Sequence, residues 1–157
     1  MNSQGWRVPA LVLVALVLGS GPALAQQQPP PNLVGTWKAV SPGAAVVGAN
    51  PYHPGATGTS QSEPRFTDPI EFTITIGTQK ANRFTGELTD GKRTEKLIGA
   101  ISPNNLGGIV LDDDGQYIFT IRDLETLDVC YSHMTPASKV VACFPWTKNR
   151  VFRESSG

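Results

Sequence analysis

Asn32-Leu33-Val34-Gly35-Thr36-Trp37-Lys38 places a glycine and a tryptophan at the start of a long run of strand-like segments. A tight turn and an aromatic plug followed by successive strands are typical of the beginning of a small up-and-down β-barrel. Apolar and polar residues then alternate, as from Ile70 to Ile76, with the period of a half-buried strand. Eight segments have this character: 33–40, 70–76, 84–89, 93–101, 106–111, 117–122, 127–131 and 139–146.

Short turns separate most of these segments. Asp90-Gly91 is the strongest hairpin signal, because glycine accepts the positive φ that such turns require. No segment has the apolar spacing of three and four residues that indicates a helix. Strands joined by short turns pair with their sequence neighbours, and eight of them can close on themselves. We predict one all-β domain over 33–157, an eight-stranded antiparallel up-and-down meander barrel, with an open sandwich as the alternative.

The two cysteines test this reading of the last two strands. A hairpin turn at Pro136-Ala137 pairs Cys130 directly with Cys143, where a cross-strand pair brings the two Cβ atoms near bonding distance. We therefore predict one disulfide between them. The alternating positions form the mostly apolar inner face and place the disulfide outside: Val129, Tyr131, His133, Val140, Ala142 and Phe144.

The N-terminal residues predict export. Arg7 precedes an apolar run over 8–18, and Ala23-Leu24-Ala25 follows, which is the pattern of a secretory signal peptide over 1–25. The run is too short for a membrane anchor, which needs about 20 apolar residues. Residues 26–32, rich in glutamine and proline, predict an extended tether. We expect a periplasmic or secreted protein, where two cysteines usually form a disulfide.

The charge balance excludes two classes of partner. Removing the signal peptide takes away Arg7 and no acid, which leaves 12 basic against 13 acidic residues. A nearly neutral chain lacks the excess of basic residues that binds nucleic acid or an anionic membrane surface. We therefore expect neither partner, and no membrane span after signal cleavage.

The first strand resembles that of the calycins, the group that includes lipocalins and avidins, through Gly35-Thr36-Trp37. In lipocalin-like barrels this tryptophan closes one end of the barrel and packs under an arginine from the end of the last strand. The resemblance implies a structural role for Trp37, with Arg150 or Arg153 supplying the cation over its ring.

Two departures narrow this resemblance. The stretch after 145 is too short and too broken for the long lipocalin helix, so the architecture is more similar to avidins. Avidins carry an asparagine two residues after the tryptophan to bind biotin, and this chain has Ala39 there. Only Trp37 and Trp146 remain after signal removal, whereas avidins line the pocket with several tryptophans. The resemblance therefore does not extend to biotin binding.

The segment 41–68 is the one long irregular stretch, rich in glycine, alanine, proline and serine. Loops of this length in a compact domain are usually functional or disordered. Over an open barrel it would form a lid, with Tyr52, His53, Arg65 and Phe66 as its best binding side chains. A solvated insertion is the alternative.

Inward-facing side chains of the later strands complete the candidate site. Tyr131 and His133 could give a mostly apolar cavity a few polar contacts, as ligand pockets tend to have. Alternatively, His133 lies at the barrel rim with its ring hydrogen-bonded. We predict a ligand site formed by Tyr52, His53, Tyr117, Phe119, Tyr131, His133 and Phe144.

Other chemistries lack their residue patterns. His53 and His133 have no cysteine or carboxylate cluster beside them in the sequence, so we expect no metal, haem or other cofactor. Asp112-Asp113-Asp114-Gly115 lacks the alternate-position acids and closing glutamate of a calcium loop, which favours a hairpin turn. No catalytic motif is present, so we expect that the protein is not an enzyme. The alternative is catalysis by two carboxylates that strands distant in sequence bring together inside the barrel.

These observations support one leading hypothesis, an exported non-catalytic binding module that holds a small apolar or amphipathic ligand. The alternative is a protein-interaction module. Small periplasmic inhibitors of bacterial metalloproteases resemble disulfide-bonded eight-stranded barrels with a Gly-x-Trp start, which implies insertion of 26–32 into an enzyme cleft. A structural envelope protein without a ligand is the third hypothesis.

Overall fold

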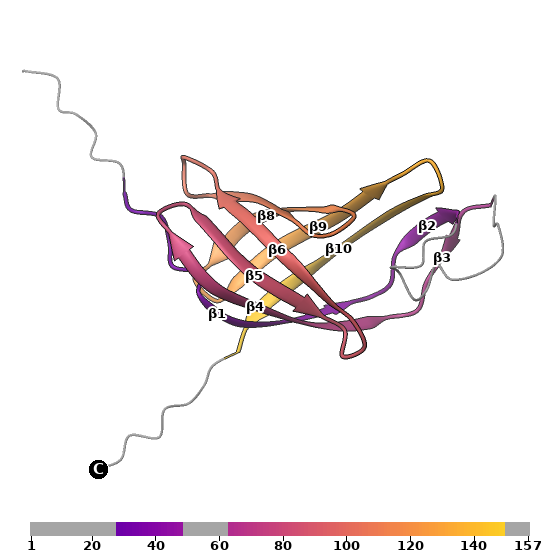
Figure 1. The fold of residues 1–157 in the computed structure, drawn as a ribbon, viewed down its shortest axis with the longest axis horizontal. Coiled ribbons are helices and arrows are strands. Elements are labelled where there is room, and N and C mark those ends of the chain that lie inside the picture. The colour runs from indigo at the N-terminus through magenta and orange to yellow at the C-terminus, as the bar shows by residue number, and fades with distance from the viewer. Residues whose placement is uncertain (1–27, 49–62, 150–157) are drawn as a thin grey trace, which may run out of the picture.

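The computed structural model describes residues 28–48 and 63–149, which form strands and contain no helix (Figure 1). No helix in these residues is therefore long and apolar enough to cross a membrane. The ten strands are β1 (Gly35–Ser41), β2 (Ala45–Gly48), β3 (Arg65–Phe66), β4 (Ile70–Lys80), β5 (Arg83–Thr89), β6 (Thr94–Ile101), β7 (Gly107–Leu111), β8 (Gln116–Asp123), β9 (Thr126–Met134) and β10 (Ser138–Lys148).

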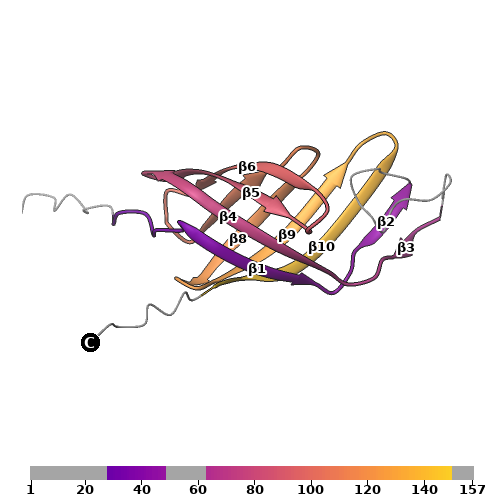
Figure 2. The ribbon, with the colours of Figure 1, turned by 60° about the horizontal axis from the view of Figure 1, so that its bottom comes forward.

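Eight of these strands close into a barrel. β1 pairs with β4, the strands from β4 to β10 pair in sequence order, and β10 returns to pair with β1. Every pairing is antiparallel, and the closing one runs from Trp37 opposite Lys148 to Ala39 opposite Trp146. Figure 2 shows β1 and β10 converging along one side. The predicted meander barrel is confirmed, and the open sandwich is excluded because the sheet has no free edge there.

The segment expected to be irregular, 41–68, instead begins and ends with strands. β2 pairs with β10 over Ala45–Gly48, and β3 pairs with β2. Pro42 and Gly43 interrupt the path from β1 to β2, since Gly43 has φ +113° and a Cβ there would lie 2.2 Å from the Thr67 carbonyl oxygen. The long strand β10 thus pairs with β2 over its first residues and with β1 over its last. Residues 49–62, including Tyr52 and His53, lie outside the described residues.

The β9–β10 hairpin has the predicted register. Cys130 lies opposite Cys143 and His133 lies opposite Val140. The two cysteines form the predicted disulfide, and both lie on the exposed outer face. Side chains alternate across a strand, so Tyr131 and Phe144 face inward and are buried. Both the disulfide and its outward orientation are therefore confirmed.

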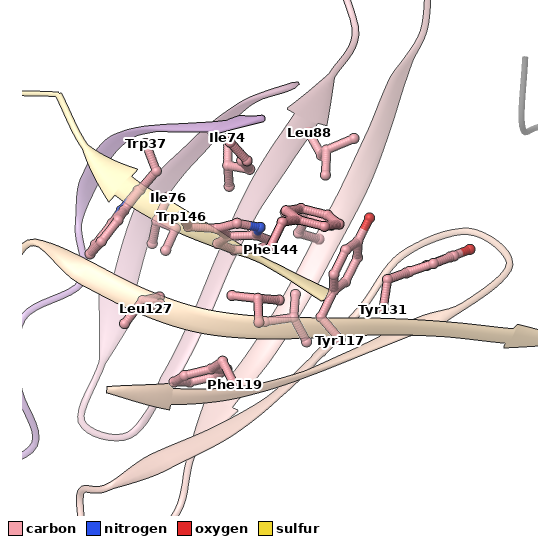
Figure 3. Packing of buried hydrophobic residues seen from close by; sticks show 14 of the residues in the cluster. Trp37, Ile74, Ile76, Leu88, Tyr117, Phe119, Leu127, Tyr131, Phe144 and Trp146 are labelled. Carbon is pink, nitrogen blue, oxygen red and sulfur yellow. The ribbon is translucent and has the colours of Figure 1, made fainter. Parts of the chain in front are cut away.

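One end of the barrel is filled by its own side chains, and we call it the plugged end (Figure 3). Trp37, Leu33 and Trp146 are buried there, and Trp37 Nε1 donates a hydrogen bond of 2.9 Å to the Leu33 carbonyl oxygen. Lys148 Nζ lies 5.2 Å from the Trp37 ring centroid. The last strand therefore supplies a cation over this ring. The arginines predicted for that place, Arg150 and Arg153, lie outside the described residues.

The residues before β1 lie along the plugged end. Asn105 Nδ2 donates to the Gln28 carbonyl oxygen at 2.8 Å, and Gln79 Nε2 donates to that of Pro31 at 2.9 Å. Gln79 also accepts a hydrogen bond of 2.8 Å from the backbone N–H of Leu33. Asn105 from the turn between β6 and β7 and Gln79 from the end of β4 thus hold the backbone of the segment that the sequence indicated as a tether.

Candidate functional site: a cavity at the open end of the barrel

The opposite end of the barrel, which we call the open end, contains a cavity of about 370 Å³. It lies between the turn that follows β5, the segment that leads from β3 into β4, and the inner faces of β8, β9 and β10. Its apolar wall is formed by Ala44, Val46, Pro69, Ile70, Phe72, Leu88, Val140, Ala142 and Phe144. Its polar wall is formed by Ser41, Thr67, Asp68, Asp90, Lys92, Arg93, Glu95, Tyr117 and Tyr131.

The cavity exists because the inward side chains become small toward this end. Tyr117 packs edge-on against Trp146 with ring centroids 5.3 Å apart, and Phe72 stacks on Phe144 at 6.1 Å. Beyond these rings the inward positions include Ser41 and Ala142, which leave the space unfilled. A barrel of eight strands is just wide enough for side chains to fill or for one small ligand to enter. This barrel does both, at opposite ends.

Three of the predicted site residues, Tyr117, Tyr131 and Phe144, line this cavity. Phe119 does not, and its placement in the site was wrong. It is buried closer to the plugged end, where its ring lies 6.3 Å from that of Phe84. The two lid residues Tyr52 and His53 lie outside the described residues.

His133 faces inward as predicted but does not line the cavity. Its Nε2 lies 2.6 Å from Ser138 Oγ, and its Nδ1 lies 3.2 Å from Asp114 Oδ2. The structure thus places His133 outside the cavity lining, with its ring hydrogen-bonded as in the alternative. The ring links the β9–β10 hairpin to the turn between β7 and β8.

The order serine, histidine and aspartate is also that of a nucleophile, its base and the acid that orients the base. Ser138, however, is only 4% exposed and forms no part of the cavity wall. A reacting carbonyl would have to come within about 3 Å of the serine oxygen, and the cavity does not bring it there. The arrangement is better explained as a buried polar network that fixes two turns, since buried polar groups need partners.

The acidic turn between β7 and β8 is a hairpin, as predicted. Asp112 Oδ1 accepts hydrogen bonds from the backbone N–H groups of Gly115 at 2.6 Å and Asp114 at 3.2 Å. Gly115 packs closely against Tyr131, since a Cβ there would lie 2.4 Å from the Tyr131 hydroxyl oxygen and would displace the ring. The Tyr131 hydroxyl in turn donates to Asp114 Oδ1 at 3.0 Å. The turn is thus anchored to the cavity wall by a tyrosine.

A group of carboxylates that the sequence did not indicate adjoins the cavity. Glu95 of β6 lines the cavity, and its carboxylate lies with those of Asp112 and Asp114 so that one oxygen of each falls within 4.8 Å of the others. Burial and the nearby charges of Asp112, Asp114 and Asp113 raise the pKa of Glu95 from 4.5 to about 7. Glu95 therefore changes charge near neutral pH.

The two tyrosines of the polar wall remain neutral. Burial raises the pKa of both hydroxyls above the ordinary value, and the charges of Asp112 and Asp114 raise them further. Their rings lie 4.7 Å apart and are tilted by 47°. The polar wall thus places the Glu95 carboxylate beside two aromatic rings that carry protonated hydroxyls.

The sequence contained one signal for Glu95. Leu97 faces inward, and a residue two positions earlier on the same strand faces the same way. The proximity of Glu95 to Asp112 and Asp114 depends on how β6 lies beside the β7–β8 turn, and the alternation of residues in the sequence does not predict that arrangement.

No protein-family model, curated protein or solved structure matches this chain. The protein can therefore be classified only by the architecture and the cavity of the described residues. The protein is a closed eight-stranded antiparallel β-barrel, plugged at one end and hollow at the other, with one external disulfide.

Proposed function

We propose that this chain is an exported, calycin-like binding barrel that holds a small amphipathic molecule in the cavity of the open end. The observation that carries the proposal is the cavity of about 370 Å³ above a plugged core. Ligand pockets have volumes of about 300–1,000 Å³ and are mostly apolar with a few convergent polar groups. Here rings such as Phe72 and Phe144 supply the apolar wall, and Glu95, Tyr117 and Tyr131 supply the polar groups.

Two features support export and the calycin-like assignment. The disulfide is exposed on the barrel wall, and such bonds persist in oxidising compartments. Trp37 lies under Lys148 at the end of the last strand, which parallels the tryptophan and cation of lipocalin-like barrels. The segment that a protease inhibitor would insert is hydrogen-bonded to the barrel from Gln28 onward, so the cavity is the better-supported site.

Native mass spectrometry of the protein purified from its own host tests the proposal. We expect an excess mass on the order of a few hundred daltons, from a ligand of the size that this cavity admits. Ala142→Phe, which fills the cavity from β10, should remove the excess mass. Val141→Phe is the matched control, because the adjacent Val141 is 51% exposed on the outer face and should retain it.

Thermal melts and an intact disulfide would show that both variants fold. The absence of any excess mass from all three proteins, with no small molecule found to bind the wild type, would contradict the proposal.

A fluorophosphonate probe tests the non-catalytic part of the proposal. We expect no labelling of the native protein, because Ser138 is buried away from the cavity. Labelling that disappears in Ser138→Ala and persists in Ser132→Ala would instead show a reactive serine and would overturn this part.

A further inference from the structure

The polar wall of the cavity has an uneven distribution of charge. The two bases on this wall, Lys92 and Arg93, are exposed on the turn between β5 and β6. Asp90, on the same turn, accepts hydrogen bonds from the backbone N–H groups of both residues. Glu95 is half-buried within the barrel wall. A charged group that enters the cavity therefore passes a rim of mixed charge, where Asp68 and Asp90 lie with the two bases, and meets the Glu95 carboxylate inside.

Asp112 lies beside Glu95, outside the cavity lining, and one oxygen of its carboxyl group, the buried Oδ2, lacks a hydrogen-bond partner within the described residues. Within the same part of the chain, no lysine, arginine or histidine forms an ion pair with Asp112 or Glu95. A buried carboxylate is costly unless it is paired. Glu95 is the member of this carboxylate group that lines the cavity, so a positive charge beside it would be stabilised.

The aromatic rings beside Glu95 favour the same sign of charge. Tyr117 and Tyr131 line the cavity with their ring centroids 4.7 Å apart. The face of a tyrosine ring attracts a cation within about 6 Å, especially an organic ammonium group. A carboxylate next to two such rings is a suitable environment for an amine head group.

We propose that the ligand of this cavity is an amphipathic amine, with its cationic head group at Glu95, Tyr117 and Tyr131 and its apolar tail against Phe72 and Phe144. This inference rests on the proposed function and adds the chemical class of the ligand.

A metal ion fits the same carboxylates less well. Asp114 already uses Oδ1 for the Tyr131 hydroxyl and Oδ2 for His133. Glu95 and Asp112 then remain, whereas calcium takes about 6–8 oxygen ligands. The extensive apolar wall also has no role in holding a metal ion, but it suits the tail of an amphiphile.

Proton competition gives the site a pH dependence of defined sign. The pKa of Glu95 is raised to about 7, so a proton competes with the ligand for this carboxylate as the pH falls through neutrality. The groups that face Glu95 or share its end of the barrel are Asp68, Asp90, Lys92, Arg93, Asp112, Asp113, Asp114, Tyr117, Tyr131 and His133. The tyrosines stay neutral in this range because burial raises the pKa of their hydroxyls.

Calorimetric titration of the full mature protein with octylammonium, octanoate and octanol tests the proposal, because these probes share one tail and differ in the charge of the head group. At about pH 8 we expect octylammonium to bind at least about tenfold more tightly than octanol, from a charge-assisted interaction. This preference should decrease at about pH 5.5, where Glu95 is protonated.

Glu95→Gln should abolish the preference for octylammonium over octanol at about pH 8. Glu71→Gln is the matched control, since Glu71 is exposed on the outer face of β4, and it should behave as the wild type. A calcium titration of each protein tests the metal alternative.

Three outcomes would overturn the inference: tighter binding of octanoate than of octylammonium, an unchanged preference in Glu95→Gln, or calcium binding that requires Glu95 without binding of octylammonium. In the first two cases octanol binding would still support the proposed function. If no probe binds at all, both proposals fail.

Discussion

The two ends of the barrel use the same alternation of side chains for different purposes. At the plugged end the inward positions carry Trp37, Trp146 and Leu127, and all three are buried. At the open end they carry Ser41, Ala142 and Glu95, and a cavity remains. Packing of large rings stabilises a barrel, whereas small and charged residues in the same fold leave room at some cost in stability. Stability is therefore expected to depend mainly on one end, and binding on the other.

Truncation of one large aromatic residue at each end should give the largest difference. Trp37→Ala should lower the free energy of unfolding by about 3–5 kcal/mol, since it creates a cavity in a filled core. Phe144→Ala should lower it by less than Trp37→Ala, because one side of the Phe144 ring already borders open space and less new cavity is created. Urea titrations of both variants measure this difference, and equal losses would contradict the division between the ends.

The disulfide should stabilise the barrel without affecting binding. Its cysteines are 13 residues apart, and a loop of this size corresponds to about 3 kcal/mol on the chain-entropy model. Cys130→Ser combined with Cys143→Ser should therefore lower the urea midpoint but leave the affinity for octanol unchanged. A large loss of affinity in a double variant that still folds would show that the outer wall controls the cavity.

The two tryptophans should respond differently to replacement by phenylalanine. Trp37→Phe removes the donor to the Leu33 carbonyl oxygen and should cost about 1–3 kcal/mol, because that buried acceptor loses its partner. Trp146 Nε1 is buried without a hydrogen-bond partner among the described residues, so Trp146→Phe loses ring volume but no hydrogen bond. Thermal melts should show the smaller decrease for Trp146→Phe.

Glu95→Gln should have the smallest effect on stability, and the effect should be favourable. The folded-state pKa of about 7 exceeds the usual 4.5, so stability of the wild type falls as the pH rises between these values and is constant above them. Since the side chain is only partly buried, solvent screening reduces the gain expected from Glu95→Gln at about pH 8 to about 1 kcal/mol. The difference should vanish near pH 4.5, and melts at both pH values measure it.

Sequence alternation predicted which side chains face inward but not how far along the barrel they lie. Tyr117 and Phe119 both face inward from β8, yet only Tyr117 reaches the cavity. Depth depends on the tilt and stagger of the strands, which neighbouring residues in the sequence do not determine. For the same reason Glu95 could be assigned to the inner face but not to a group with Asp112 and Asp114.

Local signals were reliable where the interaction itself is local. Gly91 adopts φ +86° in the turn predicted at Asp90-Gly91, and the hairpin register placed Cys130 opposite Cys143. β2 was missed because Ala45–Gly48 is short, lacks polar alternation and follows Pro42 and Gly43. It is a strand because β10 extends past β1 and offers it a partner, which is a property of the closed barrel.

Both ends of the described chain lie at the plugged end of the barrel, which affects how the protein can be immobilised on a surface. Gln28 is bonded to the turn that follows β6, and the Asn149 N–H donates to the Thr36 carbonyl oxygen, so the described chain enters and leaves beside Trp37. A linker joined directly before Gln28 or after Asn149 would therefore leave the barrel on the side opposite the cavity. Such attachment would orient every molecule with its entrance toward the solvent, which makes immobilised protein suitable for direct ligand capture.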